Sequence, residues 1–234
     1  MITIYTEKYR HEYKLPLNVR DMTVLTGKLS RIMAPDGHGQ DGSYFVRSLY
    51  FDDPFDSALR GKLNGESVRE KFRIRFYDMD DSFIRLEKKS KRSGLCSKRS
   101  APLTREQTER LIAGDRSFLP DTGDPLLTEL YAKMSGELLR PRLTVDYRRK
   151  AFVFPAGNVR ITFDFGIRSD ENISAFFDPA PAAFPVPCAA VMEVKYDEFL
   201  PQFIADAVQL GGMRTSAVSA FSKYASGRFA CGTL

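Results

Sequence analysis

Residues 69–77 have the sequence "REKFRIRFY", in which basic and apolar side chains alternate. Successive side chains of an extended chain point to opposite faces, so Phe72, Ile74 and Phe76 share one face of a predicted β-strand. The opposite face carries four bases, Arg69, Lys71, Arg73 and Arg75. An antiparallel strand commonly buries one face and leaves the other in water, so one basic face does not by itself indicate an anion site.

The same alternation recurs in four further segments. They are "RHEYKL" at 10–15, "FIRLEKKSK" at 83–91, "VRITFDF" at 159–165 and "VMEVKY" at 191–196. In each segment, bases and a few acids share the face opposite the apolar residues. The segment "TVDYRRKAF" at 144–152 is less regular, because Arg148 and Arg149 fall on opposite faces and the period does not select between them.

The periodicity predicts strands and helices within a single domain, residues 1–234. Strands are expected at 5–15, 44–51, 69–77, 82–91, 143–153, 158–167 and 190–196. Helices are expected at 18–33, 104–113, 124–138, 201–210 and 218–226, with caps at Asn18, Thr104 and Asp124. Strands at hairpin-like spacing with separate helices indicate an antiparallel α+β fold, most economically one closed barrel.

The composition excludes several classes of protein. Hydrophobic residues make up 43% of the chain and charged residues 28%, which is typical of a globular protein. The sequence has no run of about 18 apolar residues and no apolar signal-peptide core, so we expect neither membrane insertion nor secretion. Three widely spaced cysteines indicate reduced thiols in a cytoplasmic protein, and two histidines disfavour a His-rich zinc site or a Ser-His-Asp triad.

Two arrangements fit the alternating faces. In the first, the sheet packs its apolar faces on helices and exposes its charged faces to water. In the second, the sheet closes into a barrel, so that the charged faces line a wet tunnel and the helices cover the outside. Arginine, which grips phosphate with two N–H groups, outnumbers lysine on these faces, and the acids are few and isolated, as metal ligands would be. The predicted helices also carry enough Leu, Ile and Met to cover the strands, yet the period alone leaves both arrangements open.

Eight short segments occur in the order seen in the VTC domain, which this chain resembles from about residue 5 to residue 226. They are "EYK", "VRSLYFDD", "KFRIRFY", "RLEKKSK", "RPRLTVDYRRKAF", "VRITFD", "VMEVKY" and "FSKY". The VTC domain is the catalytic domain of the vacuolar transporter chaperone polyphosphate polymerase and belongs to the triphosphate tunnel metalloenzymes. The resemblance implies an α+β fold with a closed eight-stranded antiparallel β-barrel, the triphosphate tunnel, and helices packed outside. It also implies an ATP–polyphosphate phosphotransferase that moves the γ-phosphate of ATP onto a polyphosphate chain.

The resemblance also assigns site residues, position by position. The bases for catalysis and substrate binding are Lys14, Arg73, Arg75, Lys89, Arg149, Arg160 and Lys223. Lys98 is added as a substrate-binding base, although the segment around it, "SGLCSKRS", aligns loosely. Glu193 is assigned as the ligand of a Mn²⁺ or Mg²⁺ ion. The resemblance thus selects Arg149 over Arg148, and for Arg69, Lys71 and Arg85 we expect solvated faces or positions at the tunnel mouth.

The first strand departs from the hydrolytic relatives, whose pattern there is E-x-E-x-K. Arg10 replaces the first acid, while Glu12 and Lys14 match, and this favours phosphotransfer over hydrolysis. A hydrolase of tripolyphosphate or nucleoside triphosphates with the same fold and a non-catalytic polyphosphate-binding module are the alternatives.

The expected partners are ATP and inorganic polyphosphate, and the sequence identifies no membrane-protein partner. Nucleic acid is not expected, because the aromatic residues lie opposite the cations rather than among them, where bases would stack.

Overall fold

The protein is described by a computed structural model that covers residues 10–39, 42–209 and 221–232. Its strands all belong to one sheet. They are β1 His11–Leu17, β2 Ala34–Pro35, β3 Tyr44–Asp52, β4 Val68–Tyr77, β5 Asp80–Arg92, β6 Leu95–Leu103, β7 Arg140–Phe154, β8 Val159–Asp170, β9 Phe184–Pro185 and β10 Ala190–Tyr196. The helices are α1 Val19–Leu29, α2 Ser57–Leu63, α3 Arg105–Ile112, α4 Pro125–Gly136, α5 Gln202–Val208 and α6 Lys223–Ala230. Short 3-10 turns occupy Pro120–Thr122, Ala156–Asn158 and Ile173–Ala175.

The eight long strands follow one path, β1-β10-β8-β7-β3-β4-β5-β6, and every pair is antiparallel. Each predicted strand overlaps an observed one, and only the first part of the predicted strand 5–15, residues 5–9, lies outside the described residues. The alternation did not predict β6, because the buried face of this strand includes the small residues Ser97 and Ala101 and gives a weak apolar period.

The predicted closed barrel is wrong for the described residues, because the sheet has two free ends, β1 and β6. Only one isolated bridge joins these strands, where Arg10 and Cys96 exchange two backbone hydrogen bonds of 3.0 and 3.1 Å. In an antiparallel register Glu12 would next lie opposite Gly94, but Gly94 belongs to the turn between β5 and β6 and has a φ of 90°. The turn therefore ends the ladder after one pair, and pairing in the other direction would involve residues outside the described range.

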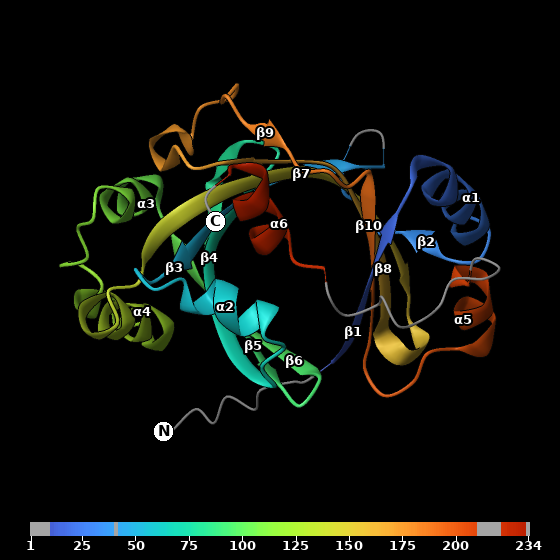
Figure 1. Cartoon of the computed structure of the whole chain (residues 1–234). Helices are drawn as coiled ribbons and strands as arrows, with labels where there is room; N and C mark the ends of the chain where they lie inside the picture. The colour runs from blue at the N-terminus through green and yellow to red at the C-terminus, as the bar shows by residue number, and fades with distance from the viewer. Residues whose placement is uncertain (1–9, 40–41, 210–220, 233–234) are drawn as a thin grey trace.

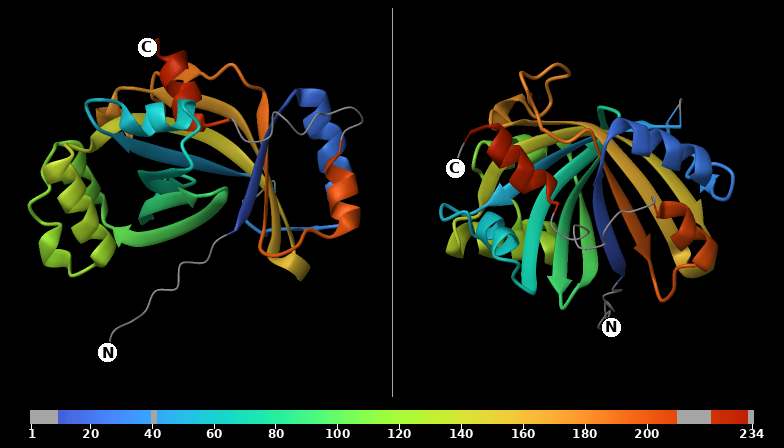
Figure 2. Two further views of the ribbon diagram at one scale, coloured as in Figure 1. Left: turned by 60° about the horizontal axis from the view of Figure 1, so that its bottom comes forward. Right: turned by 45° about the vertical axis from the view of Figure 1, so that its right-hand side comes forward.

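Four helices cover the outer face of the curved sheet in two pairs (Figures 1 and 2). On one side, α3 and α4 pack Leu111, Leu127 and Leu130 on a cluster that includes Phe72 and Ile74. On the other side, the helices α1 and α5 contribute Leu25, Leu29 and Ile204 to a second cluster with strands β1, β8 and β10. The apolar faces of the alternating strands thus point outward to helices, as the tunnel arrangement predicted.

The caps predicted for the outer helices are confirmed. The Asn18 side chain accepts from the amide of Asp21 at the start of α1, and Asp124 accepts from the first amides of α4. At α3, Thr104 and Gln107 form both hydrogen bonds of a capping box.

Two further helices, α2 and α6, pack on the inner face of the sheet at one end. Figure 1 shows α6 inside the curve of β7. Its Tyr224 and Ala225 join a buried cluster with Leu143 and Val145 of β7. The approach is close, because a Cβ on Gly227 would lie 2.8 Å from a methyl carbon of Leu143. This packing leaves the rest of the inner face as a cavity.

Two short helices differ from the sequence prediction. The helix predicted at 218–226 begins at Lys223 in the structure, and residues 218–220 lie outside the described range. The alternation missed α2, which has only seven residues and follows Asp56, a residue with a φ of 56°.

Candidate functional site

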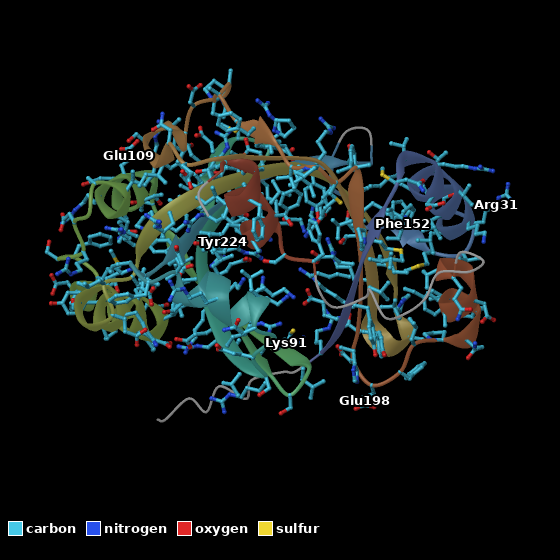
Figure 3. All side chains as sticks on the ribbon, viewed as in Figure 1. Arg31, Lys91, Glu109, Phe152, Glu198 and Tyr224 are labelled. Carbon is cyan, nitrogen blue, oxygen red and sulfur yellow. The ribbon has the colours of Figure 1, made fainter. Side chains whose placement is uncertain are left out.

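The inner faces of the strands, together with α2 and α6, enclose a cavity of about 140 Å³. This volume is enough for on the order of ten water molecules, so the cavity is a wet space. In Figure 3, Tyr224 on α6 and Lys91 near the C-terminal end of β5 mark two walls of the cavity, whereas Arg31 and Glu198 lie on the outside of the molecule.

Basic side chains dominate the lining of the cavity. The eleven bases are Lys14, Lys62, Arg69, Lys71, Arg73, Arg75, Lys89, Lys91, Arg149, Lys195 and Lys223. Two acids, Glu12 and Glu193, complete the charged lining. Such an excess of one sign inside a hollow concentrates the electrostatic field and attracts an anion.

The structure brings most of the predicted site residues to this cavity. Those that line it are Lys14, Arg73, Arg75, Lys89, Arg149, Glu193 and Lys223. The two others, Lys98 and Arg160, lie on the inner face of the sheet but outside the lining. Arg160 contacts Asp36 at 2.5 Å and donates to the Tyr44 hydroxyl at 3.0 Å, and Lys98 contacts Glu87 at 2.9 Å.

Glu193 is at the centre of a buried cluster of ammonium groups. Its Oε1 lies 2.8 Å from Lys223 Nζ and 3.1 Å from Lys14 Nζ, and its Oε2 lies 3.1 Å from Lys195 Nζ. Burial opposes the ionised form, but these lysines outweigh burial and hold the pKa of Glu193 well below its ordinary value. Glu193 is therefore a carboxylate at any physiological pH.

Arg149 is fixed by a second buried carboxylate. Its Nε and Nη2 donate to the two oxygens of Asp164 at 2.6 and 2.8 Å, and Lys223 lies 2.5 Å from the same carboxylate. Burial of Asp164 disfavours its ionised form, yet Arg149 and Lys223 lower its pKa below the ordinary value. By contrast, the neighbouring Arg148 points to the outer face and donates to Ser43 at 2.9 Å.

A third carboxylate, Glu87, forms ion pairs with the arginines on the inner face of β4. Its Oε2 accepts from Arg73 Nε at 2.7 Å and lies 3.7 Å from Arg75, while its Oε1 accepts from Lys98. Glu87 is 3% exposed. Burial raises its pKa, but Arg73, Arg75 and Lys98 together hold that pKa well below the ordinary value.

Tyrosine rings lie among the cations of the cavity. Tyr50 and Tyr147 accept from Arg73 at 3.2 Å and from Arg75 at 2.8 Å, and Tyr224 also lines the cavity. The expectation that the aromatic residues lie only opposite the cations is therefore wrong. Tyr147 shares the inner face with Arg149, two residues further along β7.

The residues around Glu193 fit a divalent cation that arrives with a phosphate ligand. Carboxylate oxygens are the donors that Mg²⁺ and Mn²⁺ prefer, and Mg²⁺ commonly uses one or two carboxylates with phosphate oxygens. Glu12 Oε1 is buried without a hydrogen-bond partner, and Lys14 Nζ lies 3.3 Å from it and 3.1 Å from Glu193. The described residues contain no group of three or more His, Cys, Asp or Glu able to hold a metal, so the ligand would have to complete the coordination shell.

The sequence did not assign several residues that line the cavity. Glu12, Arg69, Lys71 and Lys195 lie on the charged faces that the alternation defined, so the period alone could have selected them. Lys62 had no such signal, because α2 reaches the cavity only through the packing of that helix against β3 and β4.

Comparison with known proteins identifies one family. A family model described as the VTC domain matches residues 9–231.

The dual-specificity RNA pseudouridine synthase RluF of Escherichia coli K12 is 33% identical over 108 residues, 46% of this chain and 35% of the relative. The chain thus spans about a third of the length of the curated relatives it matches.

Two solved structures are similar to this one. A Hippeastrum protein, HpAC1, described as an adenylyl cyclase candidate with a dominant triphosphatase activity, superposes with a TM-score of 0.54 at 13% identity and covers 97% of both chains. A Bacillus halodurans adenylate cyclase candidate gives a TM-score of 0.49 at 11% identity over 86% of each chain. The first of these similarities supports the fold alone. In the described part of this chain, no helix is long and apolar enough to span a membrane.

Proposed function

Because this chain belongs to the VTC domain family, we propose that it is a polyphosphate polymerase-like phosphotransferase. It moves the γ-phosphate of ATP onto a polyphosphate chain inside the cation-lined cavity, and it requires Mn²⁺ or Mg²⁺. The observation that carries the proposal is the lining of the cavity, where eleven bases accompany two acids.

The buried carboxylates give the arginines a role beyond charge. Asp164 and the Tyr147 hydroxyl occupy the Nε and Nη2 donors of Arg149, and its Nη1 donors remain for a phosphate oxygen. Glu87 orients Arg73 in the same way. A guanidinium that is held in place needs little reorganisation when charge develops on the transferred group, and this favours the transition state.

Phosphoryl transfer needs little covalent chemistry from a protein, because positioning and charge stabilisation supply most of the rate enhancement. The bases of the cavity provide both, and an oxygen of the acceptor phosphate is the attacking group. The lysines Lys14, Lys89 and Lys223 have flexible stems, so their ammonium groups can move from a carboxylate to a phosphate oxygen.

Glu193, with Glu12 beside it, would hold the divalent cation. When bound, this cation neutralises phosphate charge and aligns the oxygens of the reacting groups. The ammonium groups of Lys14, Lys195 and Lys223 contact Glu193 in the structure, and they must move toward phosphate oxygens when the carboxylate takes up a cation.

The proposal is tested by incubating the purified protein with ATP and Mn²⁺ and resolving the products on a polyphosphate gel. Chains that lengthen with time, together with release of ADP, are expected. Release of orthophosphate without longer chains would favour the hydrolase of the same fold. Binding of polyphosphate without turnover would favour the non-catalytic module. No binding of tripolyphosphate at low salt would refute all three functions.

A further inference from the structure

The cavity face of β4 and β5 places like charges directly opposite each other. In the register of these strands Arg69 pairs with Lys91, and Lys71 pairs with Lys89. Cross-strand pairs of like charge destabilise a sheet when the side chains are this close. Two consecutive pairs of this kind therefore need compensating negative charge. Among the described residues, the protein supplies a carboxylate to only one of these four bases, Lys89, which contacts Glu12.

The bases of the site fall into two classes according to their partners. Each base that the family resemblance assigns has a carboxylate partner, as Arg73 has Glu87, Arg149 has Asp164 and Lys89 has Glu12. The other assigned bases are paired in the same way. Within the described ranges, neither Arg69, Lys71 nor Lys91 has a carboxylate within ion-pair distance. The uncompensated charge of the cavity is thus concentrated where β4 meets β5.

Lys71 is partly buried in the lining of the cavity. Among the residues that the structure describes, its Nζ has only weak neighbours, the Ser222 hydroxyl at 3.4 Å and the ring of Tyr224 at 5.4 Å. Burial and the nearby Lys14, Arg69 and Lys62 lower the pKa of Lys71 to about 8. In the absence of a ligand, a charged Lys71 therefore destabilises the folded protein.

We propose that Lys71, with Arg69 and Lys91 beside it, forms a second phosphate-binding position that is separate from the carboxylate-held arginines. Lys71 and Arg73 are two residues apart on one face of β4, about 6.6 Å along the strand. One phosphoryl group of the ligand lies at Lys71 while another lies at Arg73. This inference rests on the proposed function, since it concerns the same ligand in the same cavity.

The test compares Lys71→Met with the wild-type protein in two measurements, tripolyphosphate affinity at low salt and thermal unfolding without ligand. Methionine keeps the apolar stem of lysine and removes its charge. We expect affinity to fall roughly tenfold or more, because a charge-assisted contact is lost. The unfolding temperature should stay the same or rise, because a repelled cation has been removed. Lys71→Arg should restore affinity.

Lys28→Met is the matched control, because Lys28 is exposed on the outer helix α1 and the substitution makes the same change in net charge. Unchanged affinity in Lys71→Met would overturn the inference. A fall in affinity together with a lower unfolding temperature would also overturn it, because Lys71 would then be a structural residue. If the wild-type protein itself fails to bind tripolyphosphate, the proposed function fails, and that result is distinct from the two others.

Discussion

Substitution of Glu87 by glutamine tests whether buried carboxylates organise the cavity. Glu87 is 3% exposed, and its two oxygens contact Arg73, Arg75 and Lys98. Removing one partner of a buried ion pair destabilises a protein by about 3–5 kcal/mol. Glutamine keeps one oxygen that can accept from Arg73, so we expect a loss near the lower end, about 3 kcal/mol.

The expected change in unfolding temperature follows from the size of the domain. For a domain of this length, 1 kcal/mol corresponds to about 2–4 °C, so Glu87→Gln should unfold about 6–12 °C below wild type. The variant also loses a negative charge from a site that attracts anions, and tripolyphosphate should bind more tightly. A tenfold gain in affinity would stabilise the variant by about 1.4 kcal/mol more than wild type at the same saturating concentration.

Thermal unfolding with and without tripolyphosphate measures both effects. Glu109→Gln is the control, because Glu109 is an exposed residue of α3 whose ion pair with Arg105 lies on the surface, and such pairs contribute little. A Glu87→Gln variant as stable as wild type would refute the argument that Glu87 balances the buried guanidiniums. A ligand-induced shift no larger than that of wild type would refute the argument that Glu87 opposes the anion.

Three further predictions concern the other charged residues. Glu193→Gln should reduce metal-dependent turnover by orders of magnitude and leave metal-free tripolyphosphate affinity unchanged or higher; full turnover in a Mn²⁺ titration would exclude Glu193 as the ligand. Arg149→Ala should weaken tripolyphosphate binding by roughly tenfold or more in calorimetry, whereas Arg148→Ala should not weaken it. Equal losses in the two variants would contradict the conclusion that only Arg149 faces the cavity. Glu87 and Asp164 have pKa values below their ordinary ones, so their contribution to stability is complete above about pH 5 and is lost as the pH falls through the folded-state pKa values. A free energy of unfolding, measured with denaturant, that does not decrease between about pH 5 and about pH 3 would contradict this.

The sequence by itself predicted seven of the eight long strands, all but β6, and which residues share a face in each of them. The period of two in "REKFRIRFY" and its counterparts is a local property, because side chains of a strand alternate whatever the strand packs against. It therefore placed Phe72 and Ile74 on one face and Arg73 and Arg75 on the other, and the structure shows the first face under the outer helices and the second lining the cavity. Helix caps such as Thr104 could be predicted from the sequence for the same reason, because their hydrogen bonds join residues only a few positions apart.

Only the tertiary structure decided which charges balance each other and where the sheet ends. Glu87 and Arg73 are neighbours because β5 pairs with β4 in one register, and Asp164 meets Arg149 because β8 pairs with β7. The same register leaves Lys71 opposite Lys89. The sheet stays open beyond one bridge because β6 begins only at Leu95, directly after the turn that contains Gly94. Ion pairing and closure depend on contacts between segments distant in the chain. Alternation within one strand fixes which face is buried, but it does not determine which residue of another strand lies opposite.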